Sequence, residues 1–112
     1  MKMIVASVRT TKFPDLRDEL LQSGNASITV YPVHSCQQQL PAMQYGGTSV
    51  ETNLVSKMRV EIAVNDDHVA GVIDTIRSIA SSGIDEEGII AVYDLDQCIC
   101  IRTGEQGPEA LQ

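Results

Sequence analysis

The chain has three cysteines, which are candidates for chemistry because of their residue type and, for two of them, their spacing. Cys98 and Cys100 lie two positions apart near the end of the sequence. On an extended strand their side chains would share one face, in a geometry that suits a disulfide poorly. Free cysteines often serve as small buried apolar residues. We therefore predict that both are buried, and a thiol pair with a redox role is the alternative.

Two histidines and several carboxylates are the other candidates. His34 and His68 are distant in the sequence, so no metal site is predicted unless His34 and Cys36 meet ligands from another chain. The acidic run at 85–87 could hold a hard cation, but a solvated turn is the favoured interpretation. The carboxylate pairs at 15 and 18 and at 94 and 96 lack a neighbouring nucleophile or base. The chain is therefore predicted not to be an enzyme.

Charge and composition exclude several classes of function. The 112 residues include 15 acidic and 8 basic side chains, for a net charge of −7, and the basic ones are scattered. Such a surface argues against nucleic acid and anionic membranes as partners. No apolar run is long enough to insert into a bilayer. An odd number of cysteines and no signal peptide before the first strand predict a reduced, cytoplasmic protein.

The strongest periodicity, over residues 57–104, belongs to the elements that must position any site. Alternating apolar and polar residues at 57–64 predict a half-buried strand. Helical spacing follows, with Asn65 as N-cap and Gly83 as the C-terminal stop. The apolar run from Ile89 predicts a long, largely buried last strand that ends near Gly104. This half therefore reads as strand, helix and strand.

The first half of the chain repeats that order. The patterns predict a strand at Met3–Val8, a helix at Pro14–Ser23 and a strand at Ala26–Val33 that ends near Pro32. Residues 34–56 then lose all periodicity, which is typical of a functional or disordered loop. We predict a single domain over 1–112, with a tail at 103–112 and a ferredoxin-like α+β fold, a split βαβ sandwich of order βαββαβ. Polar-leaning strand positions at Thr29, Glu61, 98, 100 and 102 predict an open sheet face that forms an oligomer interface.

Three segments resemble the PII signal-transduction family. They are KFPDLRDELLQSG near the start, KMRVEIAVNDDHVAGVIDTI in the centre and IRTGE near the end. The resemblance runs nearly end to end and implies a homotrimer that binds adenine nucleotides between subunits. It also implies a long loop that engages a protein partner, such as a transporter or a metabolic enzyme.

The resemblance also implies which residues form the sites. Thr29, Glu61 and Val64 match the family's adenine and ribose positions, and Gln39, Lys57 and Arg102 match positions near the phosphates and the loop base. The family's phosphate loop resembles GDGK, and this chain reads EEGI, which keeps only Gly88. The partner-binding loop would include Cys36, Gln38, Tyr45, Gly46 and Gly47.

Two further departures weaken the match to nitrogen-regulating members. Cys100 stands where the family has one of two arginines, and Val50 stands where those members carry a tyrosine that is uridylylated. An anion beside carboxylates is repelled, so we predict that ADP or AMP binds better than ATP. A divergent branch associated with carboxysomes, which binds bicarbonate together with ADP or AMP, is the favoured comparison.

A small-molecule effector such as bicarbonate would be held by Lys57, Arg59 and Arg102. Three alternatives stay open at this point. They are nitrogen regulation with ATP and 2-oxoglutarate, a small ferredoxin-like enzyme of the dimeric α+β barrel type, and a purely structural oligomer. No covalent cofactor is predicted.

Overall fold

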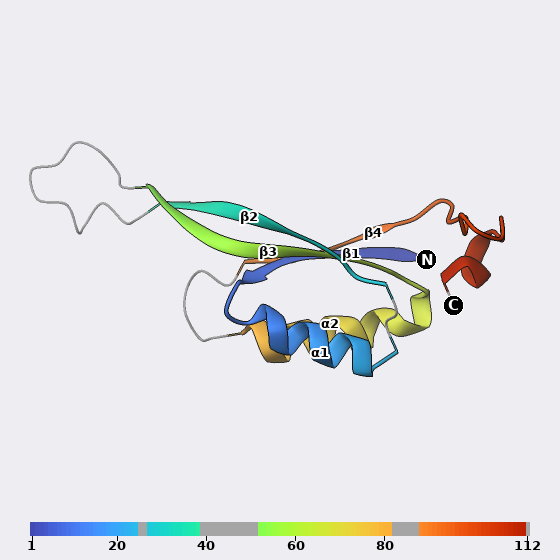
Figure 1. Ribbon diagram of the computed structural model, residues 1–112, viewed down its shortest axis with the longest axis horizontal. Helices are drawn as coiled ribbons and strands as arrows, with labels where there is room; N and C mark the ends of the chain where they lie inside the picture. Colours follow the sequence, from blue (N-terminus) through green and yellow to red (C-terminus); the bar gives the residue numbers. More distant parts are fainter. Residues whose placement is uncertain (25–26, 39–51, 82–87, 112) are drawn as a thin grey trace, which may run out of the picture.

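The computed structural model describes residues 1–24, 27–38, 52–81 and 88–111. Within these described ranges, four strands, two helices and two short 3₁₀ segments follow one another (Figure 1). Their bounds are β1 Lys2–Arg9, α1 Phe13–Gln22, β2 Thr29–Gln38, β3 Thr52–Val64, η2 Asp66–His68, α2 Val69–Ala80, β4 Ile90–Asp94 and η3 Gly107–Leu111.

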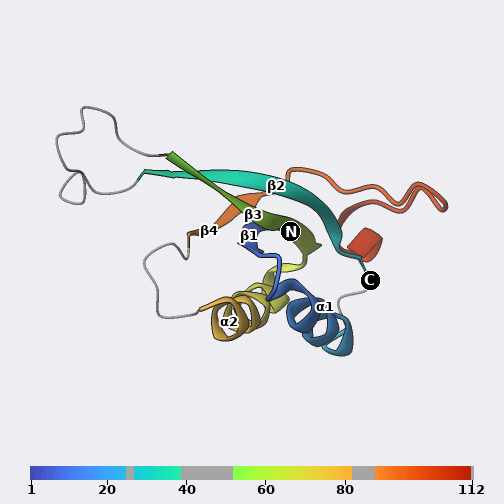
Figure 2. The same cartoon turned by 60° about the vertical axis from the view of Figure 1, so that its left-hand side comes forward.

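The four strands form one antiparallel sheet in the order β2-β3-β1-β4. Both helices lie on the same side of this sheet, as Figure 2 shows. The order of elements and the two-layer arrangement confirm the predicted α+β, ferredoxin-like fold. The sheet face opposite the helices carries the odd-numbered residues of β3.

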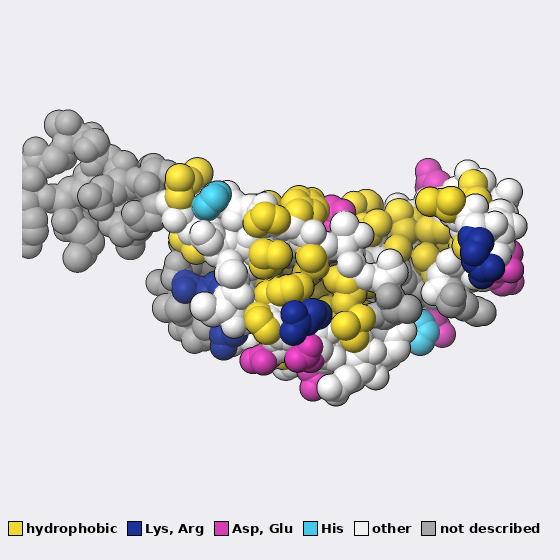
Figure 3. Space-filling view, viewed as in Figure 1, with side chains coloured by type: hydrophobic (Ala, Val, Ile, Leu, Met, Phe, Trp, Pro, Cys, Tyr) yellow, Lys and Arg dark blue, Asp and Glu magenta, His cyan; other side chains and the backbone are white. Residues whose placement is uncertain are grey.

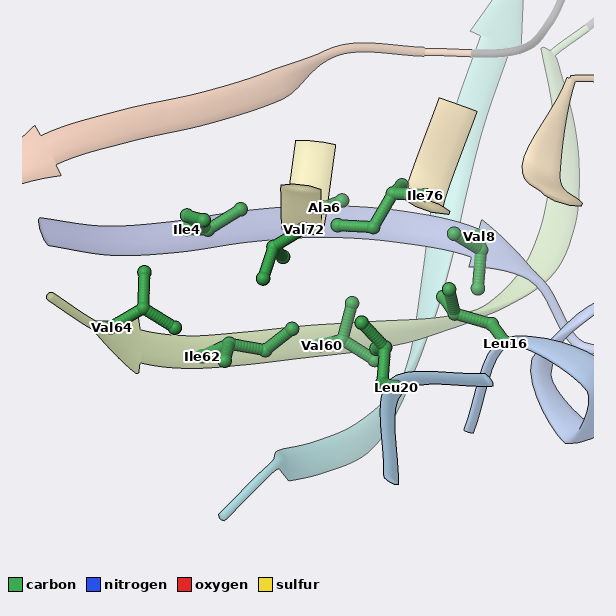
Figure 4. Packing of buried hydrophobic residues seen from close by; sticks show 10 residues of the cluster. All are labelled: Ile4, Ala6, Val8, Leu16, Leu20, Val60, Ile62, Val64, Val72 and Ile76. Atoms are coloured by element: carbon green, nitrogen blue, oxygen red, sulfur yellow. The ribbon is translucent and has the colours of Figure 1, made fainter. Parts of the chain in front are cut away.

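The core lies between the two central strands and the helices. Ile4 of β1 pairs with Ile62 of β3, and alternate residues of each strand point to the helices. These side chains and four helical ones are buried together, namely Ile4, Ala6, Val8, Leu16, Leu20, Val60, Ile62, Val64, Val72 and Ile76 (Figure 4). Truncation of a buried leucine in such a cluster costs about 2–5 kcal/mol. The alternation that predicted strand 57–64 therefore matches real burial.

The predicted bounds of the long loop, 34–56, include residues that belong to strands. Strands β2 and β3 stay paired from Thr29 opposite Glu61 out to Gln38 opposite Thr52. Pro32 does not end β2, because it lies opposite Met58 inside the strand. β2 is an edge strand, where the missing N–H of a proline is tolerated. The remaining segment, 39–51, lies outside the described residues.

The prediction of a long, buried last strand was wrong. β4 covers only Ile90–Asp94 and is mostly exposed. The chain then forms a hairpin, in which Ile99 bridges to Gln106 and the N–H of Cys100 donates to the carbonyl of Glu105 over 2.8 Å. Cys98 and Cys100 are half-buried within this hairpin and lie outside the sheet. The prediction that positions 98, 100 and 102 lie on the open sheet face was therefore also wrong.

The helix bounds agree with prediction to within a few residues. Helix α1 starts and ends one residue earlier than predicted, and Gly24 follows it with a φ of 92°. Asn65 precedes η2, and α2 starts at Val69, but the Asn65 side chain makes no capping hydrogen bond. Asn65 is thus the N-cap residue of η2, the segment that leads into α2, although its side chain does not make the capping bond. Gly83 lies outside the described residues.

Candidate functional site

One cavity brings together three of the predicted site residues. Thr29 opens β2 and lies opposite Glu61 of β3, and Val64 ends β3. All three line a cavity of about 460 Å³, which the ends of α1 and η3 also border. That volume is within the range of small-molecule sites. The predicted adenine and ribose positions therefore converge within one chain.

Glu61 is held in a defined orientation. The Tyr31 hydroxyl donates to Glu61 Oε2 over 3.0 Å, and Arg59 Nε lies 3.9 Å from the same oxygen. The pairing follows from the register, because Tyr31 lies opposite Arg59 and Thr29 opposite Glu61 on adjacent strands. Arg59 was predicted as an anion ligand, but in the structure its partner is the carboxylate of Glu61. The Glu61 charge is in turn partly balanced.

A second group joins Lys57 to Gly88. Lys57 is only 4% exposed. A Cβ placed on Gly88 would lie 3.8 Å from Lys57 Nζ, and Gly88 has a φ of 82°. That conformation favours glycine, so the backbone there can approach the ammonium closely. Two of the residues predicted to lie near the phosphates, Lys57 and Gly88, are therefore neighbours.

Arg102 lies apart from both groups. It is exposed in the turn between Cys100 and Gly104. Figure 1 shows the segment that follows β4 beyond the right end of the sheet, whereas Gly88 lies two residues before the start of β4 at Ile90. One chain therefore does not bring Arg102 to Lys57. Gln39 lies outside the described residues.

The predicted partner-binding residues are only partly described. Cys36 is exposed on the arm that β2 and β3 form beyond the rest of the sheet. Apolar and histidine side chains gather where this arm leaves the molecule, in Figure 3, and His34 and Leu54 are exposed there. Gln38 ends β2, while Tyr45, Gly46 and Gly47 lie outside the described residues.

Cys100 has an unusual environment for a thiol. The Thr103 hydroxyl and the backbone N–H groups of Thr103 and Arg102 hydrogen-bond to its sulfur and lower the pKa of the thiol, against smaller opposing effects of burial and of Glu105. Such bonds stabilise the thiolate. The prediction that Cys98 and Cys100 are buried core residues was wrong, since both are half-buried.

Two residues of the site escaped the sequence analysis. Tyr31 is found by strand register, because aligned strands place it beside Glu61. Asn65 was expected to cap a helix, but its Nδ2 donates to the carbonyl of Pro108 over 3.2 Å, and Asn65 lines the 460 Å³ cavity. A contact with a residue more than forty positions away has no signal in local spacing.

A second cavity lies elsewhere in the described part of the chain. This cavity of about 650 Å³ lies between α2 and β4, and Gly88 is the only predicted site residue that borders it.

Within the described residues, no three or more histidines, cysteines or carboxylates gather as a metal site would require. None of the helices described is both long and apolar enough to cross a membrane.

The chain is similar to known proteins in both sequence and structure. A family model described as nitrogen regulatory protein P-II matches residues 1–105. A nitrogen regulatory PII-like protein of Bacillus subtilis is 36% identical over 92% of this chain and 90% of its own length. Nitrogen regulatory protein P-II 2 of Methanothermobacter thermautotrophicus is 35% identical over 99% and 97%.

Two solved structures of B. subtilis GlnK have the same fold. One aligns with a TM-score of 0.82 at 34% identity and covers 98% of this chain and 97% of that one. The other, described as a GlnK–ATP complex, aligns with a TM-score of 0.81 at 33% identity and covers 98% and 96%.

Proposed function

Because this chain belongs to the nitrogen regulatory protein P-II family, we propose that it is a cytoplasmic regulator that senses an adenine nucleotide and signals to a protein partner. Proteins of this family are signal transducers and not enzymes, which confirms the prediction that the chain does not catalyse a reaction. The nucleotide, the partner and the assembly are the parts that we infer.

The observation that carries the proposal is the convergence of Thr29, Glu61 and Val64 on one cavity. A pocket for a base and a ribose needs apolar walls and a few fixed polar groups. Val64 and Ile62 supply apolar surface, and the carboxylate of Glu61, oriented by Tyr31, can accept hydrogen bonds from ribose hydroxyls. The similarity to the GlnK–ATP complex supports the same ligand class.

We expect ADP or AMP to be preferred to ATP. Lys57 beside Gly88 is one cation for the phosphates, but the residues directly before Gly88 are Asp85, Glu86 and Glu87. The residue after it, Ile89, is exposed and uncharged. Each added phosphate brings negative charge toward an acidic sequence, which opposes binding.

We further propose that the chain works as a homotrimer in which a neighbouring subunit supplies Arg102. Large apolar side chains of β4, of the residue before it and of the following hairpin are exposed in one chain, including Ile89, Tyr93, Ile99 and Ile101. Monomers rarely leave many such side chains in water. Contact with another subunit would cover them and bring a guanidinium to the nucleotide.

A second candidate is nitrogen regulation with ATP as the effector, together with 2-oxoglutarate. The names of the curated relatives and the GlnK–ATP complex favour it. Control of inorganic-carbon metabolism is the other role, with bicarbonate as a small anion near Lys57. The acidic sequence at 85–87 favours the role in inorganic-carbon metabolism, because a small anion can bind without a triphosphate.

Isothermal titration of the intact protein with ATP, ADP and AMP, each with and without bicarbonate, tests the proposal. We expect ADP and AMP to bind several-fold more tightly than ATP. Glu61→Ala should weaken ADP binding about tenfold, the effect of one lost hydrogen bond to a charged group. Glu19→Ala, which removes an exposed carboxylate of α1, should leave it unchanged.

Two results would count against the proposal in different ways. Sub-micromolar ATP binding with much weaker ADP and AMP would overturn the preference and favour nitrogen regulation. No binding of any of the three nucleotides would overturn nucleotide sensing itself. A thermal melt of each variant, compared with the unmodified protein, shows that any loss of binding is not loss of fold.

A further inference from the structure

Asn65 carries a shielded acceptor on the wall of the 460 Å³ cavity. Its Nδ2 donates to the carbonyl of Pro108 over 3.2 Å. Its Oδ1 is shielded from solvent, and no group in the described ranges donates to it. The reverse orientation of the amide would place two carbonyl oxygens together, so the bond to Pro108 decides which atom is which.

A shielded acceptor without a donor is rare in folded proteins and costs free energy, because it has lost water and gained nothing. Such a group calls for a donor, and none of the residues that the structure describes supplies one. Since Asn65 borders the same cavity as Thr29 and Glu61, a ligand in that cavity is the natural source of the donor.

The C-terminal 3₁₀ segment, Gly107–Leu111, lies against the Asn65 side chain. Pro108 accepts the amide hydrogen bond, and Ala110 and Leu111 form part of the cavity wall. In Figure 1 this segment, drawn in red, lies beside the end of β3 and the start of η2. The amide of Asn65 is therefore occupied by the C-terminal segment on its donor side and shielded on its acceptor side.

We propose that Asn65 reads the base of the bound nucleotide, and that Gly107–Leu111 releases Asn65 when the base binds. This inference rests on the proposed function of the cavity. A released amide offers one acceptor and one donor, which match the exocyclic amine and N7 of adenine in a bidentate pair. Hypoxanthine and guanine carry an oxygen in place of that amine, which would face Oδ1 with another acceptor.

The other polar groups of the cavity are less suited to this role. The carboxylate of Glu61 is engaged by Tyr31 and Arg59. Asp67 and His68 are exposed and lie 3.8 Å from one another through Oδ1 and Nε2. Asn65 is thus the cavity residue that combines a shielded polar atom with an unmet hydrogen bond within the described structure.

Base discrimination tests the first half of the inference. The intact protein is titrated with ADP, inosine diphosphate and GDP, and we expect ADP to bind at least tenfold more tightly than the other two. In Asn65→Ala this ratio should fall to within about threefold, through weaker ADP binding. Gln22→Ala removes an exposed amide outside the cavity and should keep the full ratio.

Release of the C-terminal segment is tested with two variants, a chain that ends at Gln106 and Leu111→Ala. Both should bind ADP several-fold more tightly than the full chain and keep the discrimination among bases, because the competing hydrogen bond to Pro108 is lost or weakened. Leu111→Ala leaves the chain at full length, so it decides the question if the shortened chain does not fold.

The failures are distinguishable. Asn65→Ala with a normal melt and an unchanged ratio of ADP to inosine diphosphate would overturn the base-reading role while nucleotide sensing stands. Weaker ADP binding in both C-terminal variants would overturn release and make the segment part of the site. If the intact protein binds none of the three nucleotides, the proposed function fails, and this inference fails with it.

Discussion

Asp66 forms an ion pair that links the start of β1 to the segment that follows β3. Its carboxylate accepts a hydrogen bond from the N-terminal ammonium of Met1 over 2.6 Å. This bond, together with the ammonium charge, holds the pKa of Asp66 below its usual 3.8. Because the folded pKa is the lower one, the stabilisation is complete above the unfolded value and is lost as the pH falls below it.

We therefore expect Asp66→Asn to lower the melting temperature at pH 6 by a small amount, since the pair is exposed. The difference between the variant and the unmodified protein should vanish as the pH falls through about 4 to 2. Melting curves at half-unit pH steps check this, with Asp67→Asn as the control at the neighbouring position. A difference that grows toward low pH would contradict the assignment.

Cys100 is predicted to react as a thiolate. Hydrogen bonds from Thr103 and Arg102 lower the pKa of this thiol from its usual 9.0, so more thiolate is present at neutral pH. We expect iodoacetamide to modify Cys100 several-fold faster than Cys36 at pH 7.5. Thr103→Val should remove most of this advantage by taking away the hydroxyl donor.

Mass spectrometry of the modified peptides between pH 6 and 10 measures both rates in one sample. Because the pKa of Cys100 is lowered, its rate should gain less from the rise to pH 10 than the rate of an unperturbed thiol would. Equal rates at pH 7.5 in the unmodified protein would show that the sulfur is not stabilised as a thiolate, or that another subunit covers it.

At the scale of elements, the β2–β3 arm separates the fold from the predicted partner loop. The two strands are paired as far as Gln38 and Thr52, and the buried core lies at the other end of the hairpin. Replacement of residues 39–51 by Asn-Gly, a pair that suits a two-residue hairpin turn, should therefore preserve the fold. A shorter connection also costs less closure entropy.

We expect the melting temperature of this shortened chain to stay within a few degrees of the original, and nucleotide binding to lose only what Gln39 contributes. Binding to any protein partner should be abolished. Circular dichroism and ADP titration measure the first two. A melting temperature lowered by more than about 10 °C would show that residues 39–51 stabilise the folded core.

The elements predicted correctly from the sequence are those whose apolar side chains are buried against other elements of the same chain. Strand 57–64 alternates because Val60 and Ile62 meet helices of the same chain, and helix α1 is delimited by Pro14 and Gly24. The arm was missed because the sequence at 34–38, HSCQQ, carries no apolar alternation. Pairing alone defines those strands, and pairing is a long-range property.

The last strand was misread for the opposite reason. Ile89, Tyr93 and Ile101 are apolar, which predicted burial, yet all are exposed in one chain. An apolar run in the sequence does not show whether its side chains are buried by the same chain or by another copy of it. The same limit applies to the site, because Thr29 and Glu61 meet through strand register, whereas Asn65 meets Pro108 through a distant contact.

At the scale of the whole molecule, the predicted phosphate ligands are divided between two separate parts of the chain. Lys57 lies beside Gly88, near the start of β4, and Arg102 lies in the hairpin that follows the other end of β4. Apolar side chains also remain exposed on the face that Figure 3 shows, and Leu21 of α1 and Val30 of β2 are among the exposed apolar residues. A closed ring of identical subunits would resolve both features, because each interface joins two different surfaces.

Mixed assemblies provide the decisive test of this arrangement. Lys57→Ala and Arg102→Ala should each weaken ADP binding about tenfold or more as pure assemblies. If a site takes Lys57 from one subunit and Arg102 from its neighbour, joint refolding of the two variants restores some sites. With random mixing in a ring, about one quarter of the sites regain both cations.

Titration of the refolded mixture should then show two classes of site, one of them with the affinity of the unmodified protein. Light scattering should give a mass of about 37 kDa, three times the 12.2 kDa of one chain, before and after mixing. If both cations came from the same subunit, no mixture could restore a site, because every chain would lack one of them. A single weak class of site at the trimer mass would therefore refute the shared site but not the assembly.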